Sequence, residues 1–421
     1  MEVKLAYGTD GLVVELPGER TTVVEPEYHP GAADPAGLLR EAVRRPVAGA
    51  PLREIARPGQ KVAISVCDGT RPQPRDLMLP VVLDELEGIV APEDIVVLVA
   101  TGTHRGNTRD ELRAMLGEEL LDRVRVVNHD CRNHYSLVYM GEFGRGVPVW
   151  LNHEWARADV RITTGFVEPH FFAGFSGGPK LVAPGLAALE TVLTLHDAAR
   201  IGSSAATWGV REGNPVHDDV RAIAAGTGVD FAFDVILNRE QEVVEAFAGE
   251  MFAMHDAACE AAKRIAMVKL DEPFDVVLTT NSGYPLDQNL YQAVKGMSAA
   301  EKIVKEGGVI LCAAECRDGL PDGGEYDRML ASAPSIGALR RAIEGRERVE
   351  PDQWQVQVQA RVQERARVGV YSGHLSEERL RSAHLEKVED IEAAVREALE
   401  AAGPGARLCV LPEGPQTVPY L

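Results

Sequence analysis

Short runs of β-branched and apolar residues recur along the chain, and each run leads into a polar, glycine-rich loop. The runs are KVAISVC (61–67), IVVLVA (95–100), DVRITTG (159–165), DVVLTT (275–280) and VILCAA (309–314). Segments with a helical pattern lie between them, such as residues 76–89 and residues 287–306, where Gly307-Gly308 should end the helix. Strands that alternate with helices predict βαβ units, and therefore largely parallel sheets flanked by helices.

The length of 421 residues favours two or three domains of this kind. Residues 256–274 are typical of a helix followed by a connection into a new strand, so we place a boundary there. We expect two α/β domains with parallel or mixed sheets, an N-terminal domain of residues 1–269 and a C-terminal domain of residues 270–421. Because ligands favour domain interfaces, we expect the active site in the cleft between the two domains.

The charge balance excludes one large class of partner. Acidic residues exceed basic ones, 64 against 44, which gives a formal charge of −20 and argues against nucleic acid binding. The apolar runs are strand-sized and too short to span a bilayer, so we expect no membrane segment. The six cysteines are scattered and no targeting segment is evident at the N-terminus, which favours reduced thiols in a cytoplasmic protein.

Polar residues that are suited to chemistry follow the predicted strands of the N-terminal half. Asp68 and Arg71 follow the first strand, His104 follows the second, and His170 follows the third. Ligands of open α/β sheets bind beyond the carboxyl ends of the strands. We therefore expect these side chains to lie at one edge of the sheet.

The stretch EPHFFAGFSGGPKLVAPG (168–185) allows three interpretations. A phosphate-binding P-loop is disfavoured, because Pro179 removes a backbone donor and Leu181 replaces the hydroxyl that would bind magnesium. The string GFSGG matches the nucleophile elbow of a serine hydrolase, with Ser176 as nucleophile and His196 or His217 as base. In the third interpretation Lys180 is itself the reactive group, partly desolvated by the apolar run that follows it.

Five motifs occur together in a fixed order: DGTRP (68–72), TGTHR (101–105), EPHFFAGFSGGPK (168–180), TLHDAAR (194–200) and YQAVKG (291–296). In this combination the chain resembles the lactate racemase family over most of its length. Members of that family are isomerases that carry a nickel-pincer nucleotide, which cofactor-synthesis proteins must supply.

The resemblance implies a role for each matching residue of the N-terminal half. Lys180 matches the lysine that is attached covalently to the cofactor, and His196 matches the histidine that binds nickel. His104 and His170 match the two acid/base histidines, and Asp68 matches a supporting acid at the cofactor site. Nickel is a metal that imidazole binds well.

The resemblance also implies a set of substrate-binding residues, namely Arg71, Tyr291, Gln292, Lys295 and Trp354. Arginine and lysine are suited to a carboxylate, since one offers a bidentate fork and the other a point charge. Gln292 and Lys295 stand three apart on a predicted helix, so both can face one cleft.

The implied reaction is the racemisation or epimerisation of a 2-hydroxy acid, lactate or a related compound. The hydrogen on the chiral carbon leaves as a hydride while a base removes the hydroxyl proton, and the planar keto acid takes the hydride back on either face. Each enantiomer needs its own base, which explains why there are two histidines. Histidine suits this role because its usual pKa lies near neutrality. Two alternatives stay open from the residues alone: the serine hydrolase, and a non-catalytic protein with the same fold.

Overall fold

The computed structural model of the chain describes residues 1–320 and 325–421. Contacts divide these residues into two compact units. The first unit consists of Tyr28–His196 and Ala205–Ile265, and the second of Met1–Glu27, Asp197–Ser204 and Ala266–Leu421. The prediction of two α/β domains is confirmed. The boundary after residue 269 stays a prediction, and the second unit also includes two segments from earlier in the chain.

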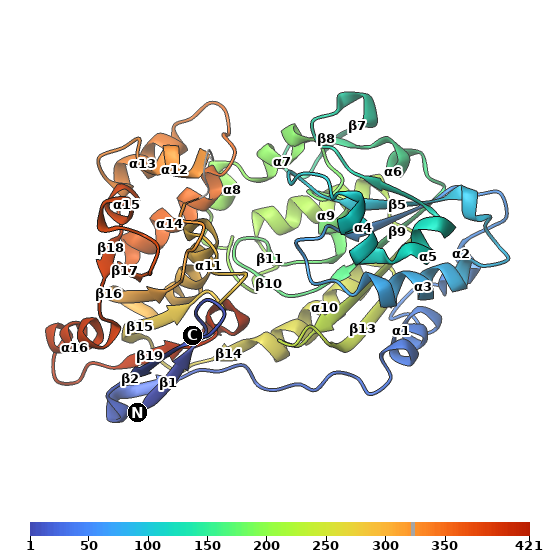
Figure 1. Cartoon of the computed structure of the whole chain (residues 1–421). Coiled ribbons are helices and arrows are strands. Elements are labelled where there is room, and N and C mark those ends of the chain that lie inside the picture. The colour runs from blue at the N-terminus through green and yellow to red at the C-terminus, as the bar shows by residue number, and fades with distance from the viewer. Residues whose placement is uncertain (321–324) are drawn as a thin grey trace. The chain divides into compact units, whose positions relative to one another are not determined.

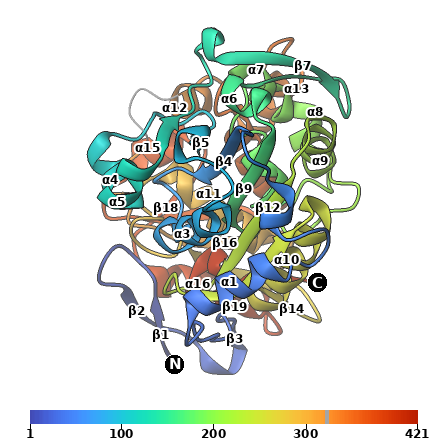
Figure 2. The ribbon, with the colours of Figure 1, turned by 90° about the vertical axis from the view of Figure 1, so that its right-hand side faces the viewer.

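A six-stranded sheet forms the centre of the first unit, with strand order β13-β12-β9-β4-β5-β6. All neighbouring pairs are parallel except β12 and β13, so the sheet is mixed. Figure 2 shows β4, β5, β9 and β12 side by side. The strands are β4 (Val62–Cys67), β5 (Ile95–Ala100), β6 (Arg125–Asn128), β9 (Val160–Phe166), β12 (Phe231–Leu237) and β13 (Val243–Gly249).

The two faces of this sheet differ in what covers them. Helices α1 (Pro35–Arg44) and α3 (Arg75–Leu86) bury leucine, valine and methionine side chains against one face. The 3-10 turn η4 (Gly178–Leu181), which carries the predicted reactive lysine, contacts β4, β9 and β12 on the other face. There the Ser65 hydroxyl donates to the carbonyl oxygen of Leu181 at 2.8 Å. The face opposite α1 and α3 therefore holds the segment on which the functional prediction depends.

Besides these strands and helices, the first unit contains a hairpin, two longer helices and several short elements. Helix α4 (Arg109–Leu116) begins with a capping box formed by Thr108 and Glu111, in which each side chain bonds the other's backbone N–H. The others are α2 (Leu52–Ile55), η2 (Pro92–Asp94), α5 (Glu118–Arg123), η3 (His134–Ser136), β7 (Leu137–Phe143), β8 (Val147–Asn152), α6 (His153–Arg157), β10 (Pro169–His170), β11 (Gly174–Phe175), α7 (Leu189–Leu195), α9 (Pro215–Thr227) and α10 (Met251–Ala266).

The second unit is built on a parallel six-stranded sheet with strand order β18-β17-β16-β15-β19-β3. Its edge strand β3 comes from the N-terminal segment and pairs with β19, almost 390 positions later in the chain. The strands are β3 (Thr21–Val23), β15 (Phe274–Thr280), β16 (Val304–Ala313), β17 (Arg367–Tyr371), β18 (Glu386–Val388) and β19 (Leu408–Leu411) (Figure 1).

Helices cover both faces of the second sheet. Helices α11 (Leu290–Glu301) and α14 (Gln353–Arg365) contact β16, while α16 (Ile391–Ala402) shares a core with the hairpin of β1 (Glu2–Leu5) and β2 (Leu12–Glu15). The other elements are η1 (Gly18–Arg20), α8 (Ala198–Ile201), β14 (Met267–Lys269), α12 (Glu325–Leu330), α13 (Ile336–Glu344), α15 (Glu377–Ser382), η5 (Gly414–Gln416) and β20 (Val418–Tyr420). None of the described helices has the length and apolarity needed to cross a membrane.

The end predicted for the helix at 287–306 is wrong. Helix α11 ends at Glu301, and Gly307-Gly308 lies inside strand β16 rather than after a helix. A β-carbon on Gly308 would come within 2.7 Å of the carbonyl oxygen of Asp275 on β15. The glycine is therefore needed for the close approach of two strands, next to a register shift in their pairing.

Candidate active site

Three neighbouring strands of the first unit end at the same edge of the sheet. β4 lies between β5 and β9, and the loops that follow these strands carry Asp68, His104 and His170 respectively. The turn that carries His104 is joined to the end of the lysine segment, because the Gly102 N–H donates to the carbonyl oxygen of Gly185 at 3.0 Å. The structure thus groups the polar loops as the alternation of strands and helices indicated.

Asp68 and His104 form a pair. The Asp68 carboxylate lies 2.7 Å from Nδ1 of His104 and also accepts the Thr70 hydroxyl at 2.7 Å. Burial raises the pKa of Asp68, but the hydrogen bonds from His104 and Thr70 and the positive charge of Arg71 outweigh burial, so the pKa lies below its usual value. An ionised Asp68 accepts the Nδ1 proton, which leaves the lone pair of His104 on Nε2.

Two residues that the sequence analysis missed hold this loop in place. Arg75 is buried at the start of α3 and donates to the carbonyl oxygens of Cys67, Asp68, Arg71 and Gln73. Gln73 accepts the Cys67 N–H at 2.8 Å and donates to the hydroxyl of Thr164 on β9 at 2.9 Å. A basic residue two positions before the apolar stretch 77–83 was the signal that could have identified Arg75.

Residues 168–180, which we call the lysine strap, are mostly buried and have regular structure. Its strands β10 and β11 pair His170 with Gly174 in a small antiparallel hairpin. Nδ1 of His170 accepts the backbone N–H groups of Phe172 at 3.4 Å and Ala173 at 3.2 Å. Since an N–H donor requires a lone pair on Nδ1, the proton of the neutral ring lies on Nε2.

Phe172 connects three of the predicted site residues. Its ring lies edge-on to His170 at 4.5 Å and to His196 at 5.2 Å between centroids. The Nζ atom of Lys180 lies 5.9 Å from the centroid of the same ring. Phe172 is 5% exposed, so it is a core residue shared by these side chains. The structure therefore brings His170, Lys180 and His196 together around one aromatic ring.

His196 has the geometry of a metal ligand. It is the C-terminal cap of α7, and its Nδ1 lies 2.7 Å from the carbonyl oxygen of Val192. The proton must therefore be on Nδ1, and the Nε2 lone pair faces the other way. Metal-binding histidines usually donate their second ring N–H to a carbonyl or carboxylate in this manner. The donor set thus fits a single imidazole ligand to nickel beside Lys180.

The hydrolase interpretation does not fit the geometry of Ser176. Its hydroxyl accepts the Glu168 N–H at 2.9 Å and donates to the carbonyl oxygen of Phe166 at 3.1 Å. The strand before it, β11, has two residues, and a 3-10 turn rather than an α-helix follows it. A nucleophile elbow needs a strand that leads into the serine and a helix that leaves it. Ser176 instead closes the lysine strap on its own backbone.

In the second unit, α11 carries three of the predicted substrate-binding residues. Asn289 caps the helix by accepting the Gln292 N–H at 3.0 Å. Tyr291, Gln292 and Lys295 are partly exposed on this helix. The indole N–H of Trp354 donates to the Tyr291 hydroxyl at 3.2 Å, so the structure brings these two predicted residues together.

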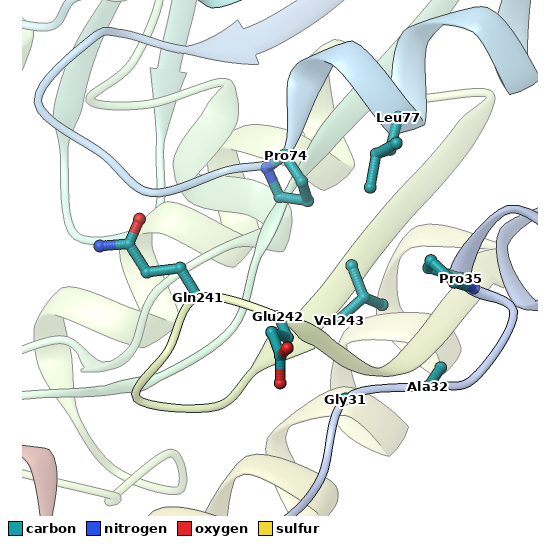
Figure 3. Close-up of a pocket in the computed structure, with 8 residues that line it drawn as sticks. All are labelled: Gly31, Ala32, Pro35, Pro74, Leu77, Gln241, Glu242 and Val243. Carbon is teal, nitrogen blue, oxygen red and sulfur yellow. The ribbon is translucent and has the colours of Figure 1, made fainter.

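A shallow pocket in the first unit lies apart from these residues. Figure 3 shows Pro74 and Leu77 on one side of it and the Gln241–Val243 turn on the other. Its lining is Gly31, Ala32, Pro35, Pro74, Leu77, Gln241, Glu242 and Val243, which includes none of the predicted site residues. Glu242 is the charged residue among them, and its carboxylate already accepts the amide of Asn238 at 2.9 Å. The pocket is therefore not the candidate active site.

Comparison with known proteins shows the family of this chain. The family model for the lactate racemase N-terminal domain matches residues 7–209, and that for the lactate racemase C-terminal domain matches residues 270–418. The chain belongs to the lactate racemase family. It is therefore an enzyme of the isomerase class, and its relatives are racemases.

Two curated relatives and a solved structure show how far the similarity extends. The lactate racemase of Thermoanaerobacterium thermosaccharolyticum is 33% identical over 417 residues, which cover 98% of this chain and 97% of the relative. The lactate racemase of Lactiplantibacillus plantarum is 34% identical over 377 residues, 89% of each chain. The structure of the T. thermosaccharolyticum lactate racemase apoprotein superposes with a TM-score of 0.94 at 33% identity and covers 100% of both chains. A Thermotoga maritima protein with a TM-score of 0.64 and 18% identity shares the fold; the match covers 91% of this chain and 97% of that protein.

Proposed function

We propose that this chain is a nickel-pincer nucleotide-dependent racemase or epimerase of a 2-hydroxy acid. The observation that carries the proposal is the opposite protonation of two histidines. His104 keeps its proton on Nδ1 against Asp68 and offers a basic Nε2, whereas His170 accepts backbone N–H groups on Nδ1 and keeps its proton on Nε2. Inversion of a hydroxyl-bearing carbon needs a base that takes and returns the hydroxyl proton, and a hydrogen-bond donor that polarises the keto oxygen of the intermediate.

Lys180 and His196 would hold the cofactor, Lys180 by covalent attachment and His196 through Nε2 to nickel. The Val192 carbonyl fixes the ring of His196 by accepting its Nδ1 proton. The ring of Phe172 lies edge-on to His196 and 5.9 Å from the Lys180 Nζ atom. When bound, the cofactor supplies an acceptor for the hydride that leaves the chiral carbon.

The protein's own residues then move the hydroxyl proton. For one enantiomer, Nε2 of His104 removes the proton, and Asp68 stabilises the imidazolium that results. When the hydride returns on the opposite face, the Nε2–H of His170 donates a hydrogen bond to the keto oxygen and the His104 imidazolium returns the proton to it, so both rings end neutral. The keto acid intermediate can therefore revert to either hand with no net change in either histidine.

We assign substrate binding to residues that carry suitable polar groups. Arg71 extends from the loop that Arg75 holds, and its guanidinium matches a carboxylate geometrically. Gln292 and Lys295 of α11 would bind the hydroxyl and carboxylate groups, with Tyr291 and Trp354 as their aromatic neighbours. The curated relatives are named for lactate, so lactate or a related hydroxy acid is the proposed substrate.

The proposal also includes maturation partners and a cellular compartment, the cytoplasm. Cofactor-synthesis proteins must load the chain before it is active. All six cysteines are unpaired and buried, which is consistent with the reducing cytoplasm.

The decisive experiment combines mass, metal and stereochemistry. The chain is co-expressed with cofactor-synthesis proteins, and intact mass, nickel content and chiral conversion of a panel of 2-hydroxy acids are measured. We expect an adduct on Lys180, about one nickel per chain, and racemisation, all of them lost in Lys180→Ala. A chain that gains neither mass nor nickel under conditions that load a known lactate racemase would contradict the proposal.

A further inference from the structure

Three buried ionisable side chains lie beneath the lysine strap, two bonded to its backbone and one stacked on a member of that pair, although the proposed reaction uses none of them. Asp234 comes from β12, His217 from α9 and His255 from α10. All three are at most 5% exposed. Burial of an ionisable group is costly unless it makes specific bonds, so the contacts of these three indicate what they hold in place.

Asp234 supports the glycine pair that precedes Lys180. Its Oδ2 atom accepts the Gly178 N–H at 2.6 Å. A β-carbon on Gly177 would lie 2.7 Å from the same oxygen, and one on Gly165 would lie 2.9 Å from Oδ1. Gly177 has a φ of 71° and Gly178 a φ of 48°, which side-chain-bearing residues rarely adopt. The two glycines are therefore shaped to bring the strap against this carboxyl group.

His255 holds the strap at an earlier position, and His217 packs against His255. Nε2 of His255 lies 2.9 Å from the carbonyl oxygen of Ser176, so it carries the proton and donates it. A β-carbon on Gly178 would lie 2.5 Å from Cδ2 of His255, which shows how closely the strap passes the ring. The ring of His217 stacks on that of His255, with centroids 5.8 Å apart.

We propose that Asp234, His217 and His255, which we call the strap clamp, are positioning residues that set where the Lys180 amine lies. The inference rests on the proposed function, because it assigns the clamp to cofactor attachment at that amine. The clamp bonds the backbone at Ser176 and Gly178, within four residues of Lys180 in sequence, and His217 stacks on the ring of His255. Apolar side chains could fill the same volume, but they could not fix the direction of the backbone that leads into η4.

The test measures the Lys180 amine in the protein without cofactor, so it does not depend on loading. Limited acetylation is followed by peptide mass mapping, and the rate at Lys180 is divided by the rate at the exposed Lys269 of the same molecule. Asp234→Leu should change this ratio by about tenfold, because small displacements of a reactive group have large effects on rate. Asp234→Asn keeps an acceptor for the Gly178 N–H and should leave the ratio within about twofold of the unmodified chain.

A second pair of variants guards against misfolding of the first. His255→Leu should change the ratio in the same way, while His255→Gln keeps a donor for Ser176 and should restore it. The control is Val97→Ala. This substitution creates a cavity at β5, on the sheet face that packs against α1 and α3. This control should lower the melting temperature without changing the Lys180 ratio. The clamp is rejected if Val97→Ala changes the ratio as much as Asp234→Leu, or if neither leucine variant changes it.

Loading provides the link to function. In co-expression, the two leucine variants should carry the Lys180 adduct in a fraction about tenfold smaller than the Asn and Gln variants. If the unmodified chain takes up no adduct, the proposed function fails, while the acetylation ratios still decide whether the clamp positions Lys180. If the leucine and amide variants carry equal adduct fractions while the unmodified chain is loaded, the clamp proposal is rejected and the proposed function is not.

Discussion

The protonation of single histidines is set by the atoms that bond their Nδ1 positions. Asp68→Asn tests this at His104, because the amide can donate to Nδ1 and force the proton onto Nε2. We expect kcat/KM to fall by about 10²–10⁴ in both directions, as when an orienting carboxylate is lost from other histidine bases. Chiral assay of the loaded variant, with nickel content as a check on loading, measures the effect.

A nearby substitution serves as the control for Asp68→Asn. Glu111 pairs with Arg105, next to His104, on the exposed start of α4. Glu111→Gln removes one charge close to the same histidine but touches no part of the proposed reaction. Its kcat/KM should stay within about twofold of the unmodified chain, since exposed ion pairs contribute little. Equal losses in the two variants would mean that the charge near His104 matters, and not its tautomer.

At the scale of an element, the loop between β4 and α3 depends on one buried arginine. Arg75→Met keeps the length of the side chain but leaves four carbonyl oxygens without their donor. We expect the free energy of unfolding to fall by about 3 kcal/mol, the scale of a few charged hydrogen bonds lost in a buried site. Urea titration of the protein without cofactor gives this value. An unchanged midpoint would show that the loop holds its form without Arg75.

The elements also show how much the sequence could predict. The strands at 61–67, 95–100 and 275–280 and the capping box at Thr108 were predictable, because apolar runs and cap pairs are local signals. The end of α11 was not, since Gly307-Gly308 serves a contact with β15 that only the folded chain contains. In the lysine strap, the family motif assigns a role to Lys180, but none of the motifs includes the side chains beneath it. Asp234, a lone charge in the apolar run FAFDVIL, was a visible signal of such a role.

For the whole molecule, the strap clamp predicts how stability depends on pH. Burial lowers the pKa of His217 to about 4 and that of His255 to about 3, whereas burial raises the pKa of Asp234 to about 7. Between about pH 6 and 4.5 the unfolded chain binds two protons on these histidines, and the folded chain binds one on Asp234. The net difference is one proton, so these groups make stability fall on acidification by about 1.4 kcal/mol per pH unit.

Asp234→Asn separates the two opposing contributions. The variant loses the proton that the folded chain binds, so the slope should steepen by about 1.4 kcal/mol per pH unit in the same window. His255→Gln should reduce the slope by a similar amount, because one proton fewer binds to the unfolded chain. Urea midpoints at a series of pH values measure both changes, and all other groups cancel in the comparison. Parallel curves for Asp234→Asn and the unmodified chain would show that Asp234 is ionised in the folded state.

The path of the chain between the two units limits how the protein can be recombined. The second unit takes its edge strand β3 from Met1–Glu27 and its helix α8 from Asp197–Ser204, directly after His196. A single crossover near residue 270 with another family member would therefore join a sheet from one parent to an edge strand from the other. In chimeras that exchange all three segments of the second unit together, all strands of each sheet come from the same parent. The second unit therefore behaves as a discontinuous module, whereas a simple C-terminal swap would mix two cores.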